Sequence, residues 1–262
     1  MTNAQAGSAR ADLGMYPFEP LRGPVERLWH RLLEVVPELP AQVEWDIDLH
    51  RFWRDPDMVV SQTCGWPLVT ELADLVDAGR IRVIGAFEPA IPEADGPTYR
   101  SVIVATAPAE LADLVERRAA VNSTASLSGW VSLVHAAHGP GATWSGPVLL
   151  TGAHLDSIRA LRDGRADVAS IDSVSWAHAG RLYPELLAGL HVIGHGPRVP
   201  CLPLIAGPGA TSIGLDRLRA GFVHALGGDA GDAIRSALLV ERFHALDAAD
   251  YAVLRGLAPA PQ

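Results

Sequence analysis

The sequence predicts an α/β fold, in which short apolar strands alternate with amphipathic helices along most of the chain. Three observations carry this prediction. The chain has 262 residues, 48% of them hydrophobic, which is enough to bury a large core. Short apolar runs at 58–60 and 119–121 are each followed by a polar turn and then by a helical pattern. This alternation is typical of parallel-rich sheets, whose ligand sites lie beyond the carboxyl ends of the strands.

The first half of the chain begins with a predicted helix at 21–36. Pro24 lies near its first turn, and Val25, Leu28 and Leu32 recur on one face. Pro67 opens a second helix, which Gly79 stops. In chain order, the pattern predicts a helix at 21–36, a strand at 58–60, a helix at 67–78, and strands at 81–87 and 99–105.

The second half repeats this scheme, with polar residues again in the turns between strand and helix. The pattern predicts a strand at 119–121, helices at 129–137 and 155–162, and strands at 166–171, 190–193 and 202–206. From Leu215 onward, the sequence predicts helix in three pieces, broken by Gly227, Gly228 and the segment 246–250.

Composition excludes several functions. The formal net charge is −9 and no basic stripe is present, which argues against a nucleic-acid partner. No apolar run approaches the length of a bilayer span, so we expect no membrane insertion. The chain contains no lysine, which excludes Schiff-base and P-loop chemistry. Residues 1–10 lack a basic stretch followed by an apolar one, which predicts a cytoplasmic protein as written, or a periplasmic or otherwise extracytoplasmic one if a precursor was trimmed.

The strongest local signal is the hydroxyl-rich turn at 122–129, between a predicted strand and a predicted helix. The first N–H groups of a helix have no partner within the helix, so this turn is suited to holding a phosphate-like or carboxylate anion. The alternative is that Ser126 or Ser128 simply caps the helix. His154 and Asp172 follow in two similar turns, and each can equally be a ligand contact or a residue at a helix start.

A further turn at 62–65 places Gln62, Thr63 and Cys64 before a helix, an environment that lowers the pKa of a thiol. Cys64 with His154 and Asp172 is therefore a conceivable nucleophilic set, although a buried, inert cysteine fits the sequence better. No histidine lies in a metal-binding motif, and we predict neither a metal nor a cofactor.

Taken together, these turns resemble, in order, those of the phosphate/phosphite/phosphonate-binding components of ABC transporters, the PhnD-like family. The resemblance spans roughly residues 9–206. It rests on the stretches 13–16, 62–67, 99–101, 122–129, 151–154 and 164–172.

This resemblance implies a two-lobed type II periplasmic-binding fold with a ligand cleft between lobes joined by two crossing strands. The first lobe would comprise 9–101 and the C-terminal return 197–262, and the second lobe 102–196. The crossings would lie at 99–104 and 197–204.

The resemblance also implies which residues contact the ligand. Leu127 stands where phosphonate binders place a hydroxyl, which implies one hydrogen bond fewer to an anion. The expected ligand contacts are Tyr16, Gln62, Thr63, Tyr99, Ser126, Ser128, His154 and Asp172, with no catalytic residue.

Three functions follow from these observations. The leading hypothesis is a binding protein for a small anion, with an ABC permease as its partner. The second is a cytosolic enzyme that reuses this fold, with Cys64, His154 and Asp172 in the cleft. The third is a ligand-sensing regulatory subunit.

Overall fold

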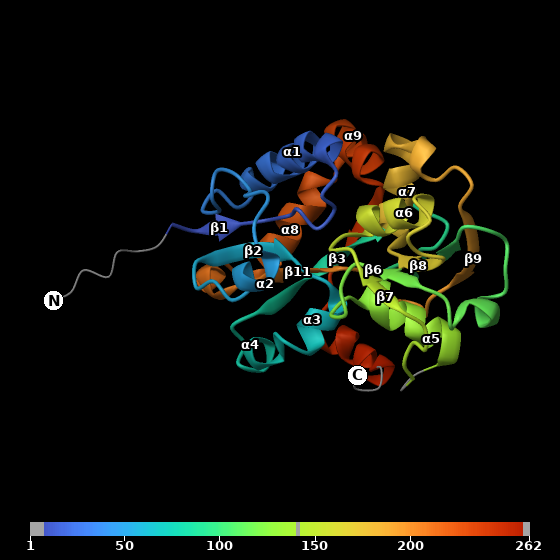
Figure 1. Cartoon of the computed structure of the whole chain (residues 1–262). Helices are drawn as coiled ribbons and strands as arrows, with labels where there is room; N and C mark the ends of the chain where they lie inside the picture. Colours follow the sequence, from blue (N-terminus) through green and yellow to red (C-terminus); the bar gives the residue numbers. More distant parts are fainter. Residues whose placement is uncertain (1–7, 140–141, 259–262) are drawn as a thin grey trace. The chain divides into compact units, whose positions relative to one another are not determined.

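The computed structural model describes residues 8–139 and 142–258, so most of the predicted polar N-terminus and the end of the Pro/Ala tail lie outside the described residues. The chain divides into two compact units (Figure 1). The first unit comprises Met1–Thr63, Thr70–Glu88 and Leu202–Asp250, and the second comprises Cys64–Val69, Pro89–Cys201 and Tyr251–Gln262.

The first unit is built on a five-stranded mixed sheet with the strand order β1-β2-β11-β3-β12. β1 pairs with β2 in parallel, whereas β11 is antiparallel to both of its neighbours, β2 and β3. The carboxyl ends of β1 and β2 therefore lie at the same edge of the sheet. The strands are β1 (Arg10–Ala11), β2 (Met58–Gln62), β3 (Arg82–Pro89), β11 (Pro203–Ala206) and β12 (Val240–His244).

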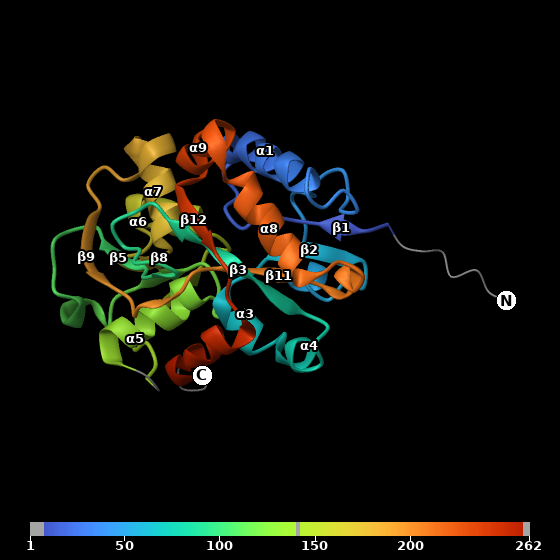
Figure 2. The same cartoon turned by 180° about the vertical axis from the view of Figure 1, so that it is seen from behind.

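Helix α1 packs on α8 and α9 in the first unit (Figure 2). The apolar stripe of α1, which includes Leu28, Trp29 and Leu32, is almost completely buried and joins Phe222 of α8 in one core. Gly221 allows this close approach, because a Cβ there would lie 2.4 Å from a methyl group of Leu32. The helices are α1 (Arg22–Leu33), α2 (Leu49–Phe52), α4 (Ala73–Asp77), α8 (Leu215–Ala225) and α9 (Gly228–Leu238).

The second unit contains another five-stranded sheet, with the strand order β7-β6-β8-β5-β9. β7, β6 and β8 are parallel neighbours, and β5 runs antiparallel to β8 and β9. Its strands are β5 (Val102–Ala105), β6 (Ala119–Val121), β7 (Val148–Leu150), β8 (Val168–Ile171) and β9 (His191–His195).

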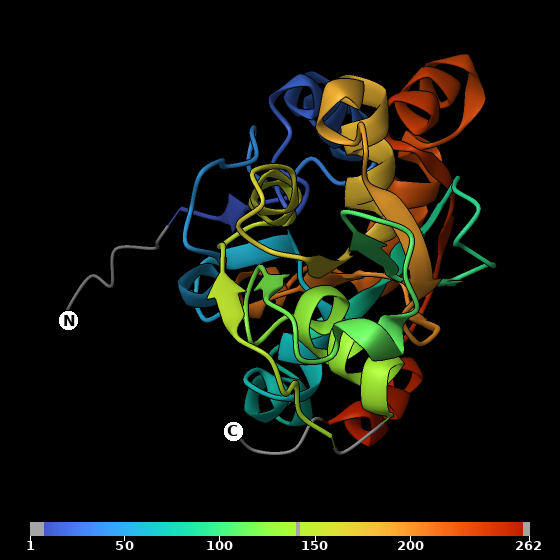
Figure 3. The ribbon, with the colours of Figure 1, turned by 45° about the vertical axis from the view of Figure 1, so that its right-hand side comes forward.

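Helices flank this second sheet, as Figure 3 shows for α5 in green and α6 in yellow. A π-helical turn, Leu127–Val131, leads directly into α5, so the two form one continuous helical segment. The α-helices are α3 (Gly65–Val69), α5 (Ser132–His138), α6 (His154–Arg162) and α7 (Ser173–Leu182), and a 3-10 helix, Ala248–Leu257, extends from the first unit into the second.

Most predicted elements appear within a few residues of their expected bounds, and three predictions are wrong. The helix predicted at 67–78 is broken between α3 and α4. The strand predicted at 99–105 is split, because Thr98–Tyr99 (β4) pairs with Val199–Pro200 (β10) in a separate two-stranded sheet. The second C-terminal helix was predicted to continue to the break at 246–250, but α9 ends at Leu238. Leu239 adopts a left-handed conformation, and strand β12 follows it.

The observed units differ from the proposed lobe boundaries. The chain passes from the first unit to the second after Glu88 and returns after Cys201, so residues 89–101 belong to the second unit. Residues 64–69 and those from Tyr251 onward also belong to the second unit. Leu254 explains the last assignment, because it packs closely against Gly65 of α3.

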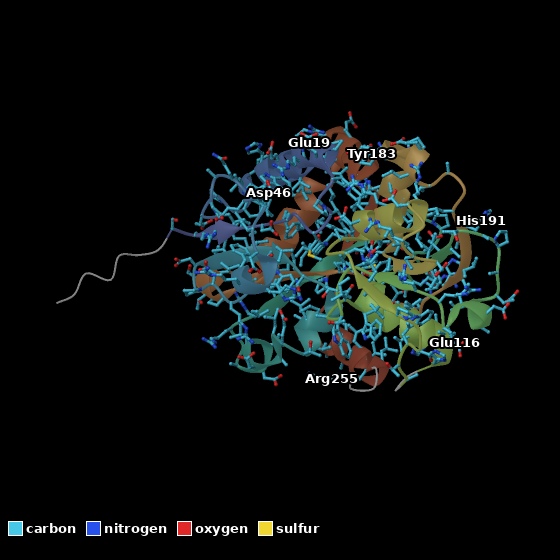
Figure 4. All side chains as sticks on the ribbon, viewed as in Figure 1. Glu19, Asp46, Glu116, Tyr183, His191 and Arg255 are labelled. Carbon is cyan, nitrogen blue, oxygen red and sulfur yellow. The ribbon has the colours of Figure 1, made fainter. Side chains whose placement is uncertain are left out.

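The surface carries the acidic charge of the chain. Glu19 and Asp46 of the first unit and Glu116 of the second are exposed, and all three are labelled in Figure 4. Among residues 8–139 and 142–258, no helix combines the length and apolar character needed to cross a bilayer.

Candidate ligand-binding site

Three neighbouring parallel strands of the second unit each deliver polar residues to the same edge of the sheet. The turn after β6 carries Ser126 and Ser128, the turn after β7 leads to His154, and β8 is followed directly by Asp172. Because β7, β6 and β8 are parallel, their carboxyl ends lie side by side. This places residues far apart in the sequence in one cluster.

Ser126 occupies the N-cap position of the helical segment that begins at Leu127. Its Oγ accepts a hydrogen bond of 3.0 Å from the backbone N–H of Gly129. Its Oγ also lies 3.5 Å from the Oγ of Ser128, and either hydroxyl can be the donor of that bond. Ser126 thus caps the helix and is in contact with Ser128.

Ser128 and His154 are joined by a hydrogen bond of 2.8 Å between Oγ and Nε2. His154 is the first residue of α6, and its Nδ1 is buried without a partner. Burial lowers the pKa of His154, and the negative charge of Asp172 partly opposes this shift. Burial therefore favours the neutral form of His154.

Asp172 is held by two donors. Its Oδ2 accepts a hydrogen bond of 2.8 Å from the hydroxyl of Tyr99, and its Oδ1 accepts one of 2.9 Å from the N–H of Ser175, so Asp172 caps α7. Tyr99 and Asp172 are both almost completely buried. Tyr99 therefore fixes the carboxylate, a role that the sequence prediction of a ligand contact did not include.

The sequence favoured a buried, inert cysteine at position 64, and the direction of its pKa shift agrees with that interpretation. Burial raises the pKa of the Cys64 thiol, and the charge of Asp172 adds to the rise, whereas hydrogen bonds from the N–H groups of Trp66, Leu127 and Ser128 oppose it. The predicted lowering of this pKa is wrong, because the desolvation of the sulfur outweighs the N–H groups.

One N–H group at the helix start is already bonded within the protein, because the Oγ of Ser126 accepts from the N–H of Gly129. The carbonyl oxygen of Ser126 accepts the first bond of the helix, from Trp130. A role of this helix start in holding an anion stays a prediction.

The geometry of the turn requires glycine at position 129. A Cβ there would lie 1.9 Å from Oδ1 of Asn122, closer than any real contact. Ser170 of β8 donates to the carbonyl oxygen of Ser128 at 2.5 Å and so ties the turn to the neighbouring strand. The position of Ser128 is thus fixed from two sides.

The remaining predicted contacts belong to the first unit. Gln62 and Thr63 lie at the end of β2 and are buried, and Tyr16 lies half-buried in the loop that follows β1. These residues share one edge of the first sheet, because β1 and β2 are parallel. Their role in ligand binding stays a prediction.

The described residues offer no metal centre. Within residues 8–139 and 142–258, no group of three or more His, Cys, Asp or Glu side chains is arranged to hold a metal ion.

Solved structures of other proteins share the fold of this chain. PhnD1 from Prochlorococcus marinus, in complex with methylphosphonate, matches with a TM-score of 0.75 and 13% identity over 95% of this chain and 96% of that one. A binding protein component of an ABC phosphonate transporter from Pseudomonas aeruginosa matches with a TM-score of 0.73 and 15% identity over 95% and 84%. The fold is that of the type II periplasmic-binding proteins.

The family follows from the sequence itself. The model of the family described as ABC transporter, phosphonate, periplasmic substrate-binding protein matches residues 72–251. The chain belongs to this family of solute-binding proteins, as the sequence analysis predicted. XAC2383 from Xanthomonas citri, bound to ATP, shares the fold with a TM-score of 0.61 and 16% identity over 95% of this chain and 94% of that one. A search of the curated proteins finds no match.

Proposed function

We propose that this protein binds a small anion with a phosphonate-like, phosphate-like or carboxylate head and delivers it to an ABC permease. The observation that carries the proposal is the hydrogen bond of 2.8 Å between Ser128 and His154, two residues that different strands bring together in a member of this family. In the proposed complex, the Nε2–H of His154 donates to the Oγ of Ser128, so that the hydroxyls of Ser126 and Ser128 can both donate to the anion. The family is described as periplasmic, which favours the extracytoplasmic alternative for this chain.

Asp172 and Tyr99 define the other side of the proposed site. A carboxylate repels an anionic head, so Asp172 is suited to accept a hydrogen bond from a substituent of the ligand that carries a proton. Tyr99 keeps the carboxylate in place through its hydroxyl. The site would then distinguish the two ends of the ligand.

The binding hypothesis is better supported than the enzyme alternative. A cysteine nucleophile acts as a thiolate, and the pKa of Cys64 is raised rather than lowered. The neutral His154 has Ser128 as its hydrogen-bond partner at Nε2. This arrangement is suited to recognition without covalent chemistry.

The proposal is tested by titration of methylphosphonate, inorganic phosphate and acetate into the wild type and a Ser126→Ala/Ser128→Ala variant, by isothermal titration calorimetry. We expect the best anion to bind the double variant at least about tenfold more weakly, because each lost charge-assisted bond contributes on the order of 1.5–3 kcal/mol. Equal affinities of the wild type and the double variant would show that both serines only cap the helix.

A matched control uses another serine pair of the same unit. Ser101 and Ser132 are buried and joined at 3.3 Å between their hydroxyl oxygens, outside the proposed contacts. The Ser101→Ala/Ser132→Ala variant should bind the anion as the wild type does. A loss of equal size in this variant would attribute the effect to folding and contradict the assignment of the site.

A further inference from the structure

Asp12 is a buried carboxyl of the first unit, outside the cluster described above. It directly follows β1, which lies beside β2 (Figure 1), and it is 1% exposed. Among residues 8–139 and 142–258, its Oδ1 has no hydrogen-bond partner. Buried polar atoms are nearly always hydrogen-bonded, so an unpartnered carboxyl oxygen calls for an explanation.

The other oxygen of Asp12 holds the loop that follows. Its Oδ2 accepts a hydrogen bond of 3.1 Å from the backbone N–H of Gly14, two residues further on, and so closes an Asx-turn. The start of this loop is fixed, because the N–H of Asp12 donates to the carbonyl oxygen of Val60 at 3.1 Å. The bond to Gly14 therefore sets the path of residues 13–16, which include the predicted ligand contact Tyr16.

The loop also packs closely on the carboxyl that holds it. A Cβ on Gly14 would lie 3.0 Å from Oδ2 of Asp12 and 3.5 Å from the ring of Trp45. The strand on the other side is tied by backbone bonds, since the N–H of Glu44 donates to the carbonyl oxygen of Ala11 at 2.7 Å. Hydration of the sealed Oδ1 requires the chain around it to move, and the loop is the segment that is tied through the carboxyl itself.

The charged groups around Asp12 do not favour its ionisation. Glu44 is its bridge partner, and the residues of β2, 58–62, carry no charge. The arginines on β1 and at the start of α1 are each paired with other carboxylates, namely Arg10 with Glu44 and Asp55, and Arg22 with Asp46. Burial raises the pKa of Asp12 to about 7, the N–H of Gly14 opposes this rise, and the charge of Glu44 adds to it.

We propose that Asp12 is a positioning residue, whose neutral carboxyl holds loop 13–16 closed with Tyr16 in place for the ligand and whose ionisation releases this loop. Because Tyr16 is an expected ligand contact, the ligand side of the inference rests on the proposed function. The open loop exposes the carboxyl to water, so opening becomes more favourable by up to about tenfold per pH unit between about 3.9 and about 7.

Amide hydrogen exchange of the ligand-free protein at pH ~5 and pH ~7 tests this role. The protection factor of the Gly14 N–H, which corrects for the intrinsic pH dependence of exchange, should fall at least about tenfold in the wild type. Asp12→Asn keeps an acceptor for Gly14 but cannot ionise, so its protection factor should be the same at both pH values. Asp12→Ala removes the acceptor and should leave this N–H unprotected at both.

Two controls separate the release of the loop from a general loss of structure. Asp55 forms a similar turn, in which its Oδ1 accepts from the N–H of Asp57 at 2.9 Å, but its carboxylate is paired with Arg10. The protection of Asp57 should therefore be the same at both pH values. Asp46→Asn removes an exposed carboxylate next to Trp45 and should keep the pH dependence of Gly14.

A ligand titration connects the loop with the proposed site. Calorimetry first gives the dissociation constant of inorganic phosphate for the wild type. If the bound anion requires the closed loop, phosphate at about ten times this constant should raise the protection factor of Gly14 about tenfold at pH ~7.

The outcomes separate the two proposals. A protection factor of Gly14 that is independent of pH in the wild type, or that changes as much in Asp12→Asn, would overturn the role of Asp12 and leave the proposed function intact. Phosphate binding without added protection of Gly14 would overturn the link between this loop and the ligand. If methylphosphonate, inorganic phosphate and acetate all failed to bind, the proposed function and the ligand side of the inference would be refuted, while the pH test would still decide whether Asp12 holds the loop.

Discussion

The two units of the molecule treat the polar residues at their strand ends in different ways. In the second unit, Ser128 after β6 and His154 after β7 are hydrogen-bonded to each other. Asp172, which follows β8, accepts a hydrogen bond from the hydroxyl of Tyr99. In the first unit, Asp12 directly follows β1 and is 1% exposed, yet its Oδ1 has no hydrogen-bond partner. Its Oδ2 accepts from the N–H of Gly14. Both units leave strand-end atoms without a partner, namely Oδ1 of Asn122 and Nδ1 of His154 in the second unit and Oδ1 of Asp12 in the first. The units differ in the chemistry of the titratable group concerned, an imidazole in the second and a carboxyl in the first.

This difference gives the two units opposite responses to pH. Burial raises the pKa of Asp12 to about 7, the N–H of Gly14 opposes this rise, and the charge of Glu44 adds to it. Burial lowers the pKa of His154. Both groups favour their neutral form, so the first unit prefers a lower pH and the second a higher one.

The comparison teaches that burial alone does not mark a binding group. Hydrogen bonds fix Ser128 and Asp172 of the second unit, as the proposed binding site requires. A carboxyl with an unpartnered oxygen costs stability instead, because desolvation is not compensated by hydrogen bonds. The variants described next test this contrast by measuring the stability of each unit within the whole protein.

The largest expected effect is that of Asp12→Asn on the first unit. A raised folded-state pKa means that stability is fully present below the unfolded value of about 3.9 and is lost as the pH rises towards about 7. This shift corresponds to a loss on the order of 4 kcal/mol over that range. Asparagine cannot ionise, so the variant should be more stable than the wild type by about 2–4 kcal/mol at pH ~8, measured by amide hydrogen exchange of the first-unit strands.

The control for this substitution is Asp216→Asn, in the same unit. Asp216 lies in the first turn of α8, and its side chain is fully exposed. Its replacement should change the stability of the first unit by less than about 0.5 kcal/mol. If Asp12→Asn destabilises the first unit at pH ~8, the carboxylate has a partner in solution, and the contrast between the units disappears.

The alternation of strand and helix could be predicted because apolar runs and turn residues are local signals. The strands at 58–60 and 119–121 appear as β2 and β6, since β-branched and small apolar residues are bounded there by polar turns. β12 could not be predicted, because its residues 240–244 mix apolar and charged side chains without alternation, and its place at the sheet edge beside β3 is set by tertiary contacts. The break between α3 and α4 also has no local signal.

The sequence predicted which turns carry the polar residues of the site, but not which of these residues are hydrogen-bonded to one another. Because β7, β6 and β8 are parallel neighbours, the polar turns that follow them meet at one edge. The partners within the cluster depend on packing between residues far apart in the sequence, such as Tyr99 and Asp172, which no local pattern reveals.

A smaller effect is expected from Tyr99→Phe in the second unit. The variant leaves a buried carboxylate oxygen of Asp172 without the donor that the wild type supplies at 2.8 Å, which should destabilise the unit by about 1.5–3 kcal/mol. Tyr251→Phe is the matched comparison, because Tyr251 is equally buried and donates at 2.8 Å to the carbonyl oxygen of Cys201. Since charge-assisted bonds are roughly twice as strong as neutral ones, urea unfolding should show the larger loss for Tyr99→Phe. Equal losses would mean that Asp172 is not charged in the folded protein.

The smallest effect concerns His154 and completes the contrast between the units. Its pKa is lowered on folding, so its contribution to stability is fully present above the unfolded value of about 6.5 and is lost as the pH falls below it. The slope is at most about 1.4 kcal/mol per pH unit, because only one proton is involved. His154→Gln keeps a group that can bond Ser128 but cannot be protonated, so hydrogen exchange of β6 and β8 should depend less on pH below ~6.5 than in the wild type. His138→Gln, at an exposed position in α5, is the control and should retain the slope of the wild type. If hydrogen exchange in His154→Gln depends on pH as steeply as in the wild type, the imidazole accepts its proton in the folded state as readily as in the unfolded chain. The site would then contain a cation, and the neutral donors inferred for it would be wrong.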